Sequence, residues 1–397
     1  MSSPLKRRDL ALTVDILDNL FGKIQPECLN ILAQTFDTCT FGAHFATVSK
    51  YGVQDLLVRL ELTKGRLEQV AAMQRLAFFG IPRFVPRVFE VGSLTTYSGQ
   101  EVEFSITEYI TGTVTLESVW QDLEDRQQAA LMDSVVGAMK KLQALRLDNK
   151  AVKKILSKAF LSQEHGSLNP TIAGGPNLGC LESAVDFFSA IIKTNNPKSQ
   201  SSAIRPSQSD TGIVITSEYI DIGQVQIPAY ILRDLQDRFV FCHNDLEPRN
   251  ILVRNASTKR KTNSYELVAI IDWEMSGFYP FAYEYSLKDH ILGSSNLYFS
   301  WYSLFKSRTR CLLPAHKSTE AIIQAVDIIM SSRKRRMTKN VGVLLREKFL
   351  IRENLVKGEE LAGGWVRQAD AGDTIQYTKQ DNDELLENVL KGLGRLL

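Results

Sequence analysis

The chain has 397 residues, more than one hydrophobic core usually organises, so its length predicts two domains or one unit of two lobes. Lys and Arg total 47 against 45 Asp and Glu, and the resulting formal charge of +2 disfavours a nucleic-acid partner bound through its phosphate backbone. Hydrophobic residues make up 44% and charged residues 23%, which is the composition of a globular protein and excludes wholesale disorder.

The five cysteines have no C-x-x-C spacing, and their odd number argues against a disulfide framework or a zinc ribbon. The first ten residues carry basic side chains, but the apolar segment of a secretion signal does not follow them. A run of ~20 apolar residues, which a membrane-spanning helix requires, does not occur. We therefore expect a cytoplasmic protein with neither a membrane nor a nucleic-acid partner. The sequence does not indicate an oligomeric state.

The first part of the chain predicts a small β-sheet with one helix. Residues 40–61 read as two short strands joined by a turn. Residues 64–79 space their apolar side chains three and four positions apart, which predicts a helix. Two further strands are predicted at 87–94 and 101–110, on either side of a polar turn. We assign residues 1–110 to an N-terminal lobe.

The rest of the chain reads as mainly helical. Residues 125–147 carry apolar side chains at helical spacing, and similar patterns recur later in the chain. Residues 111–397 are therefore assigned to a C-terminal helical lobe. Residues 195–209 are rich in Ser, Asn and Pro, and we expect them to form a mobile loop. The predicted fold class is α+β.

A polar motif of the form H-x-D-x-x-x-x-N, made by His243, Asp245 and Asn250, lies at the end of an apolar segment. Residues 239–253 and 267–274 predict a strand hairpin, and Asp272 lies at the end of the second segment. Polar residues at strand ends can be merely solvated. Together, however, these residues have the chemistry that phosphoryl transfer needs.

Each residue of this motif suits one task in phosphoryl transfer. A carboxylate near the acceptor hydroxyl orients it and takes its proton, which is the role we predict for Asp245. Asp272 and the amide oxygen of Asn250 would hold a magnesium ion that bridges the nucleotide phosphates. His243 is interpreted as structural support that fixes the loop, with proton transfer as the alternative.

The block HNDLEPRNILV, followed by IIDWE, resembles the aminoglycoside phosphotransferase and choline-kinase-like small-molecule kinases, particularly the fungal members. The resemblance implies the protein-kinase-like bilobal fold, ATP and Mg²⁺ as cofactors, Asp245 as base, and Asn250 and Asp272 as metal ligands. The metal aspartate is followed by Trp273-Glu274 where protein kinases have Phe-Gly, and no A-P-E stretch occurs downstream. Glu274 is interpreted as structural support.

The resemblance extends to the N-terminal lobe, and it implies that residues 1–110 bind the nucleotide while residues 111–397 carry catalysis and bind the substrate. Arg59, on the strand DLLVRLEL, would supply the cation that contacts phosphate, where lysine is usual, and Glu68 on the following helix would be its ion-pair partner. The alternative is that both side chains are solvated.

The same resemblance implies a nucleotide-covering loop and a hinge. The covering loop would be residues 41–52, with Gly42 as its clear glycine before the turn. Residues 104–112 resemble the hinge that binds adenine through its backbone, at Glu108 and Ile110. That segment can also be read as an edge strand leading to a turn.

The predicted function is transfer of the γ-phosphoryl group of ATP to a hydroxyl, or an amine, of a small molecule. The sequence does not separate ATP from GTP, and it does not name the acceptor, whose pocket we expect near residues 166–180 and 275–300. One alternative is a pseudokinase-like binding or regulatory protein with the same fold. Another is a kinase that acts on protein or RNA.

Overall fold

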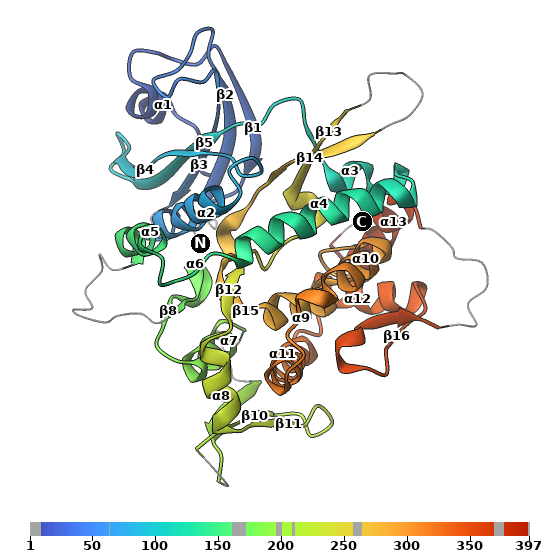
Figure 1. Cartoon of the computed structure of the whole chain (residues 1–397). Helices are drawn as coiled ribbons and strands as arrows, with labels where there is room; N and C mark the ends of the chain where they lie inside the picture. The colour runs from blue at the N-terminus through green and yellow to red at the C-terminus, as the bar shows by residue number, and fades with distance from the viewer. Residues whose placement is uncertain are drawn as a thin grey trace, which may run out of the picture.

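The structure, a computed structural model, describes residues 9–62, 64–160, 172–195, 201–208, 211–256, 264–368 and 377–395. It confirms the predicted α+β class, because a β-sheet dominates the N-terminal region and helices dominate the remainder (Figure 1). Within these ranges, the structure contains no helix with the length and apolar character needed to cross a membrane.

The N-terminal sheet has five antiparallel strands in the order β1-β2-β3-β5-β4. The predicted hairpin and the predicted later pair of strands are both present. The helix α1 and the strand β1 were not predicted, because α1 is only eight residues long and the side chains of β1 show no alternation of burial. The elements are α1 (Val14–Phe21), β1 (Cys28–Gln34), β2 (Thr38–His44), β3 (Asp55–Leu62), α2 (Leu67–Gly80), β4 (Val88–Thr95) and β5 (Glu101–Glu108).

The two faces of the sheet have different surroundings. Leu56, Val58 and Leu60 alternate along β3 and are buried in a core shared with α1. The residues between them, including Arg59 and Glu61, must point to the opposite face, since successive side chains of a strand alternate. This second face looks toward the helical region, because Arg59 reaches a side chain of that region.

Helix α2 lies between the sheet and the helical region (Figure 1). Its buried residues, such as Met73 and Leu76, belong to the large core of the helical region and not to the core under α1. We propose that the boundary between the two lobes lies near residue 110, as the sequence predicts. The chain leaves the sheet after β5, and β6 (Val114–Thr115) then pairs with β13 (Ile251–Asn255). Strand β13 belongs to residues 239–280, which we call the catalytic segment.

The helical region is built around that large core, to which α4, α9, α10 and α11 contribute. Its helices are α3 (Leu116–Val119), α4 (Asp125–Gln143), α5 (Lys150–Phe160), α6 (Gly175–Leu178), α7 (Ala184–Asn195), α8 (Ala229–Gln236), α9 (Phe281–Ile291), α10 (Phe299–Thr309), α11 (Lys317–Arg336), α12 (Val341–Arg352) and α13 (Lys379–Gly392). Its short strands outside the catalytic segment are β7 (Ile172–Ala173), β8 (Cys180–Leu181), β9 (Ser202–Pro206), β10 (Ile213–Ser217), β11 (Gln224–Ile227), β16 (Leu355–Lys357) and β17 (Trp365–Arg367).

The segment predicted as a loop at 195–209 is partly regular. Residues 202–206 form β9, which pairs with β10, so the expectation of an irregular segment is wrong there. The polar composition concealed the strand because its partner supplies the buried apolar side chains. Residues 196–200 and 209–210 lie outside the described residues.

The catalytic segment contributes to two small sheets, and one of them contains part of the predicted hairpin. Strand β13 (Ile251–Asn255) pairs with β14 (Tyr265–Ile270) and with β6 (Val114–Thr115). Strand β12 (Phe239–Cys242) pairs with β15 (Gly277–Pro280). The first predicted strand is therefore interrupted between Cys242 and Ile251, and the interruption contains the polar motif.

Candidate active site

Residues 243–250 form the catalytic loop, which connects β12 to β13. Arg249 Nη2 donates to both carboxylate oxygens of Asp245, at 2.6 Å to Oδ1 and 2.8 Å to Oδ2. Asn250 Nδ2 donates to the Asp245 carbonyl at 2.8 Å and to Oδ2 at 2.9 Å. Because the amide nitrogen of Asn250 is fixed in this way, its oxygen remains the free end of the side chain.

His243 is buried beneath this loop. Its Nε2 lies 3.0 Å from the carbonyl oxygen of Ile271, and its Nδ1 accepts from the backbone N–H of Asp245 at 3.3 Å. Burial lowers the pKa of His243 to about 4, so the ring is neutral near pH 7 with its proton on Nε2. A neutral ring with both nitrogens bonded suits the structural role that we predicted.

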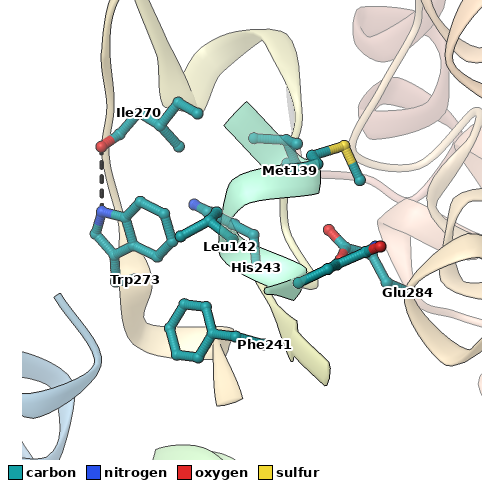
Figure 2. A pocket seen from close by; sticks show the side chains of 9 residues that line it. Met139, Leu142, Phe241, His243, Ile270, Trp273 and Glu284 are labelled. Carbon is teal, nitrogen blue, oxygen red and sulfur yellow. Dashed lines mark hydrogen bonds between the residues drawn. The ribbon is translucent and has the colours of Figure 1, made fainter. Parts of the chain in front are cut away.

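Figure 2 shows the side chains packed behind the catalytic loop, where Phe241, His243 and Trp273 meet Leu142 of α4. The cavity that they line has a volume of about 10 Å³, which holds at most about one water molecule. This cavity is too small for a substrate. The closely packed side chains around it instead support the catalytic loop.

Two buried polar contacts anchor the same loop to α9. Glu247 forms an ion pair with Lys288, and both side chains are almost completely buried. Asn244, whose φ of +62° places it in the left-handed region, donates its backbone N–H to Glu284 Oε1 at 3.2 Å. The positive φ turns the chain sharply just before Asp245. The loop is therefore fixed to α9 through residues on both sides of Asp245 in the sequence.

Asp272 lies directly beside this loop, because the backbone N–H of Ile271 donates to the Asn250 carbonyl at 2.9 Å. Its φ of +64° is unusual for a residue other than glycine. Burial, followed by the charges of Glu274 and Asp245, raises the pKa of Asp272 to about 6. Within the described ranges, its carboxylate makes no hydrogen bond.

A hard cation fits this arrangement. Mg²⁺ is usually held by one or two carboxylates together with substrate phosphates, and Asp272 with the Asn250 oxygen offers such a set. A positive ion beside Asp272 would also relieve the repulsion from neighbouring carboxylates. Apart from the undescribed segments, the chain contains no group of three or more His, Cys, Asp or Glu residues placed to hold a metal. A metal here would therefore depend on ligands from a bound substrate.

An unpredicted glycine contact supports the segment after Asp272. Gly175 has a φ of +69°, and a Cβ at this position would lie 1.9 Å from the carbonyl oxygen of Ser276. A Cβ on Gly277 would likewise lie 2.8 Å from the backbone nitrogen of Gly175. Tyr279 closes the contact by donating its hydroxyl to the carbonyl of Gly174. Only glycine allows the two backbones to approach so closely.

The predicted ion pair between Arg59 and Glu68 is wrong. Glu68 instead lies 3.2 Å from Arg75 Nη1 and 3.7 Å from Lys158 Nζ. Arg59 Nη2 lies 2.6 Å from Glu61 Oε1 and 3.0 Å from Glu274 Oε2. The reason is the position of Glu68 in the first turn of α2, from which its side chain reaches α5 and its own helix instead of β3.

Arg66, the residue before α2, completes what we call the Arg59 cluster, namely Arg59, Glu61, Arg66 and Glu274. Arg66 donates to both oxygens of Glu61 at 3.0 Å and to Glu274 Oε2 at 3.0 Å. Burial opposes ionisation of Glu61, but the two arginines outweigh it and lower its pKa. The hydrogen bond to Glu61 in turn raises the pKa of Arg66. The cluster thus ties the sheet to the segment that carries Asp272.

Gly42 does not lie in a loop, which corrects the predicted nucleotide-covering loop at 41–52. Gly42 belongs to β2, because its backbone pairs with β1 on one side and with β3 on the other. It pairs with Leu57 and therefore shares the sheet face of Arg59. The ring of Tyr109 covers it, since a Cβ on Gly42 would lie 3.1 Å from Tyr109 Cε1.

The predicted hinge follows β5. Glu108 is the last residue of that strand, and its backbone N–H and its carboxylate both bond to the backbone of Arg87. Ile110 lies just beyond the strand. For its N–H, the described part of the chain provides no hydrogen-bond partner. Of the two predicted hinge residues, only Ile110 therefore offers a free backbone donor.

Three residues of this site were missed by the sequence reasoning. Arg249 lies within the polar motif itself, so its position beside Asp245 could have been found there. Glu61 lies two residues after Arg59 on the predicted strand, so strand alternation could have placed the two side chains on one face. Arg66 carried no such signal, because its contact depends on the turn into α2, which spacing alone does not reveal.

The geometry can be compared with known proteins. Residues 216–287 match the model of the phosphotransferase enzyme family. The matched segment contains Asp245, Asn250 and Asp272, and it confirms the resemblance predicted from the sequence. A comparison with curated proteins gave no match.

Solved structures similar to this chain include two phosphotransferase complexes. APH(2")-IIa, in a ternary complex with streptomycin and ATP, is 15% identical with a TM-score of 0.43, covering 86% of this chain and 97% of that chain. Spectinomycin phosphotransferase APH(9)-Ia, in complex with ADP and spectinomycin, is 11% identical with a TM-score of 0.38, covering 84% and 93%.

Proposed function

We propose that this chain is a magnesium-dependent phosphotransferase that moves the γ-phosphoryl group of ATP to a hydroxyl of a small molecule. The observation that carries the proposal is the convergence of Asp245, Asn250 and Asp272. Asn250 bonds to the Asp245 carboxylate through its side chain and to Ile271, next to Asp272, through its backbone. The matched family supports the coarser statement that the chain is a small-molecule phosphotransferase.

In this proposal Asp245 is the general base. Its Oδ1 accepts one hydrogen bond within the described residues, from Arg249, so a lone pair remains for the acceptor hydroxyl. As the hydroxyl proton passes to Asp245, the hydroxyl oxygen bonds to the γ-phosphorus. The bond from that phosphorus to the bridging oxygen breaks, and ADP leaves with the bond's electrons.

The other residues would position the nucleotide. Asp272 and the amide oxygen of Asn250 would hold Mg²⁺, which neutralises charge on the phosphates. Arg59 faces the same space from β3 and would contact phosphate oxygens. The free N–H of Ile110 would bond to the adenine ring.

A groove of about 810 Å³ between α4, α10 and residues 377–380 is the place that we propose for the acceptor. Its lining mixes aromatic and polar side chains, including Tyr298, Ser300, Arg367 and Lys379. Such a lining suits a polar molecule with several hydrogen-bonding groups. Tyr298 also donates to the carbonyl of Glu117 at 3.3 Å, and the charge of Glu117 acts on Arg249 beside Asp245.

Nucleotide binding by the purified chain tests the proposal. We expect ATP or GTP with Mg²⁺ to raise the melting temperature, and Asp245→Asn to retain that increase. The same variant should lower phosphoryl transfer by ~10²- to 10⁴-fold, because the base is lost. Transfer is measured as ADP release with a panel of hydroxylated small molecules. If neither nucleotide raises the melting temperature of the parent, the proposal is wrong.

A pseudokinase-like binding or regulatory protein is the second candidate. It is favoured by Arg249, which bonds to both oxygens of Asp245, and by Arg59, which is occupied by carboxylates of its own chain. Asp272→Ala separates the two functions. An enzyme loses phosphoryl transfer in this variant, whereas a binding protein shows no transfer to lose and retains its partner.

A further inference from the structure

Two arginines of the Arg59 cluster converge on a single oxygen atom. Arg59 Nη2 and Arg66 Nη2 each lie 3.0 Å from Glu274 Oε2. Both arginine side chains are partly exposed, Arg59 at 28% and Arg66 at 30%. Paired guanidiniums of this kind bind carboxylate and phosphate oxygens equally well, because their donors are arranged in planar forks.

The two carboxylates of the cluster are held differently. Glu61 is completely buried and accepts from both arginines. Glu274 is 28% exposed, and the arginines reach only its Oε2. A buried carboxylate cannot leave its cations without a large cost, whereas a partly exposed one can be solvated instead. Glu61 is therefore the fixed partner and Glu274 the exchangeable one.

The exchangeable carboxylate lies where an anionic ligand would arrive. Glu274 is two residues after Asp272, the proposed metal ligand, and its charge acts on Asp272. The nucleotide phosphates must reach the same space in order to share that metal. Arg59 approaches this space from β3 and Arg66 from the start of α2, so a phosphate oxygen could replace Glu274 Oε2 without any movement of Glu61.

We propose that Arg66 binds a phosphate group of the nucleotide together with Arg59, and that Glu274 occupies their shared site in the absence of nucleotide. The inference rests on the proposed function and adds two roles to it. Arg66 becomes a second phosphate ligand, and Glu61 becomes the residue that positions both arginines. Glu274 becomes a competitor of the nucleotide instead of a support for it.

The test measures the affinity of the full chain for ATP with Mg²⁺ by calorimetry, with adenosine as the probe that lacks phosphate. We expect Arg66→Gln to weaken ATP binding by about 10- to 100-fold, the effect of losing a hydrogen bond between charged groups, and to leave adenosine binding unchanged. Arg75→Gln is the matched control, because Arg75 is equally exposed and pairs with Glu68 outside the cluster.

Glu274→Gln changes the affinity for ATP in opposite directions, depending on whether Glu274 competes with the nucleotide or supports its binding. A competitor that loses its charge should let ATP bind several-fold more tightly, whereas loss of a supporting residue or metal ligand should weaken binding. Weaker ATP binding by Glu274→Gln, or unchanged binding by Arg66→Gln, overturns the inference. Arg66→Lys provides a second variant if Arg66→Gln has a lower melting temperature; its single ammonium group should restore only part of the affinity.

The inference and the proposed function fail in different ways. A parent chain that does not bind ATP or GTP with Mg²⁺ contradicts the proposed function. A parent chain that binds nucleotide, with an Arg66→Gln variant that binds it equally well, contradicts only the inference.

Discussion

The catalytic loop and the Arg59 cluster both contain ion pairs, but the surroundings of these pairs differ. Glu247 and Lys288, which anchor the loop, have 0% and 2% of their side chains exposed. In the cluster, Glu61 is also buried, while the other three members have about 30% of their side chains exposed. Separating a buried pair costs far more than separating an exposed one. We therefore expect the loop that carries Asp245, the proposed base, to be rigid, whereas the cluster is the place where we propose that one partner is exchanged.

Removing the lysine of the buried pair should have the largest effect on stability. Lys288→Met leaves Glu247 buried without its cation, and burial already raises the pKa of that carboxyl. We expect the free energy of unfolding, measured with urea, to fall by about 3–5 kcal/mol. Adding Glu247→Leu should recover much of the loss, because an apolar pair of similar volume no longer holds an unpaired charge.

The control for this prediction is an exposed pair. Lys158 is 75% exposed and lies 3.7 Å from Glu68, so Lys158→Met should change the free energy of unfolding by less than about 0.5 kcal/mol. If Lys288→Met lowers the free energy of unfolding no more than Lys158→Met does, the buried ion pair does not anchor the catalytic loop.

The close contact between Gly175 and Ser276 should also make the segment that follows Asp272, the proposed metal ligand, rigid. Gly175→Ala introduces a Cβ against the Ser276 carbonyl at a positive φ. We expect a loss of about 1–2 kcal/mol from the left-handed conformation, and a further ~1–3 kcal/mol from overpacking. The nearby Gly179→Ala separates the two terms. Gly179 has a φ of +73°, but a Cβ there meets no atom within 4 Å.

Gly179→Ala should therefore show only the smaller loss, measured by the same urea titration. Equal losses in the two variants would mean that the Ser276 segment moves aside easily. The segment that follows Asp272 would then resemble the Arg59 cluster, whose contacts can change, more than the rigid catalytic loop.

The proximity of Asp245, Asn250 and Asp272 could be predicted from the sequence, because its signal is local. Asp245 and Asp272 follow β12 and β14, Asn250 precedes β13, and strand ends bring such residues together. The anchoring residue Lys288 was not found, since it lies on α9, about forty positions after its partner. No periodic pattern identifies a buried lysine that pairs with a distant carboxylate.

The Arg59 cluster shows a different limit of sequence reasoning. The strand that carries Arg59 was predicted correctly, and so was the helix that follows it. The partner was wrong because the choice between Glu61 and Glu68 depends on side-chain direction. Glu61 is two residues from Arg59 on one strand, so the two share a face, which the alternation of strand residues could have indicated. The contribution of Glu274 depends on how the sheet meets the helical region.

We expect the smallest effect from Glu68. It was predicted to pair with Arg59, but Glu61 and Glu274 are the partners of Arg59 in the structure. Glu68→Gln removes only the pairs with Arg75 and Lys158, both at partly exposed positions. We expect a change of less than about 0.5 kcal/mol in the free energy of unfolding, and no change in affinity for ATP with Mg²⁺. Glu61→Gln is the comparison, because it withdraws a buried charge from both arginines and should weaken ATP binding. If Glu68→Gln weakens ATP binding as strongly as Glu61→Gln, the helix carboxylate acts on Arg59 when nucleotide is bound, and the cluster then exchanges more than one partner.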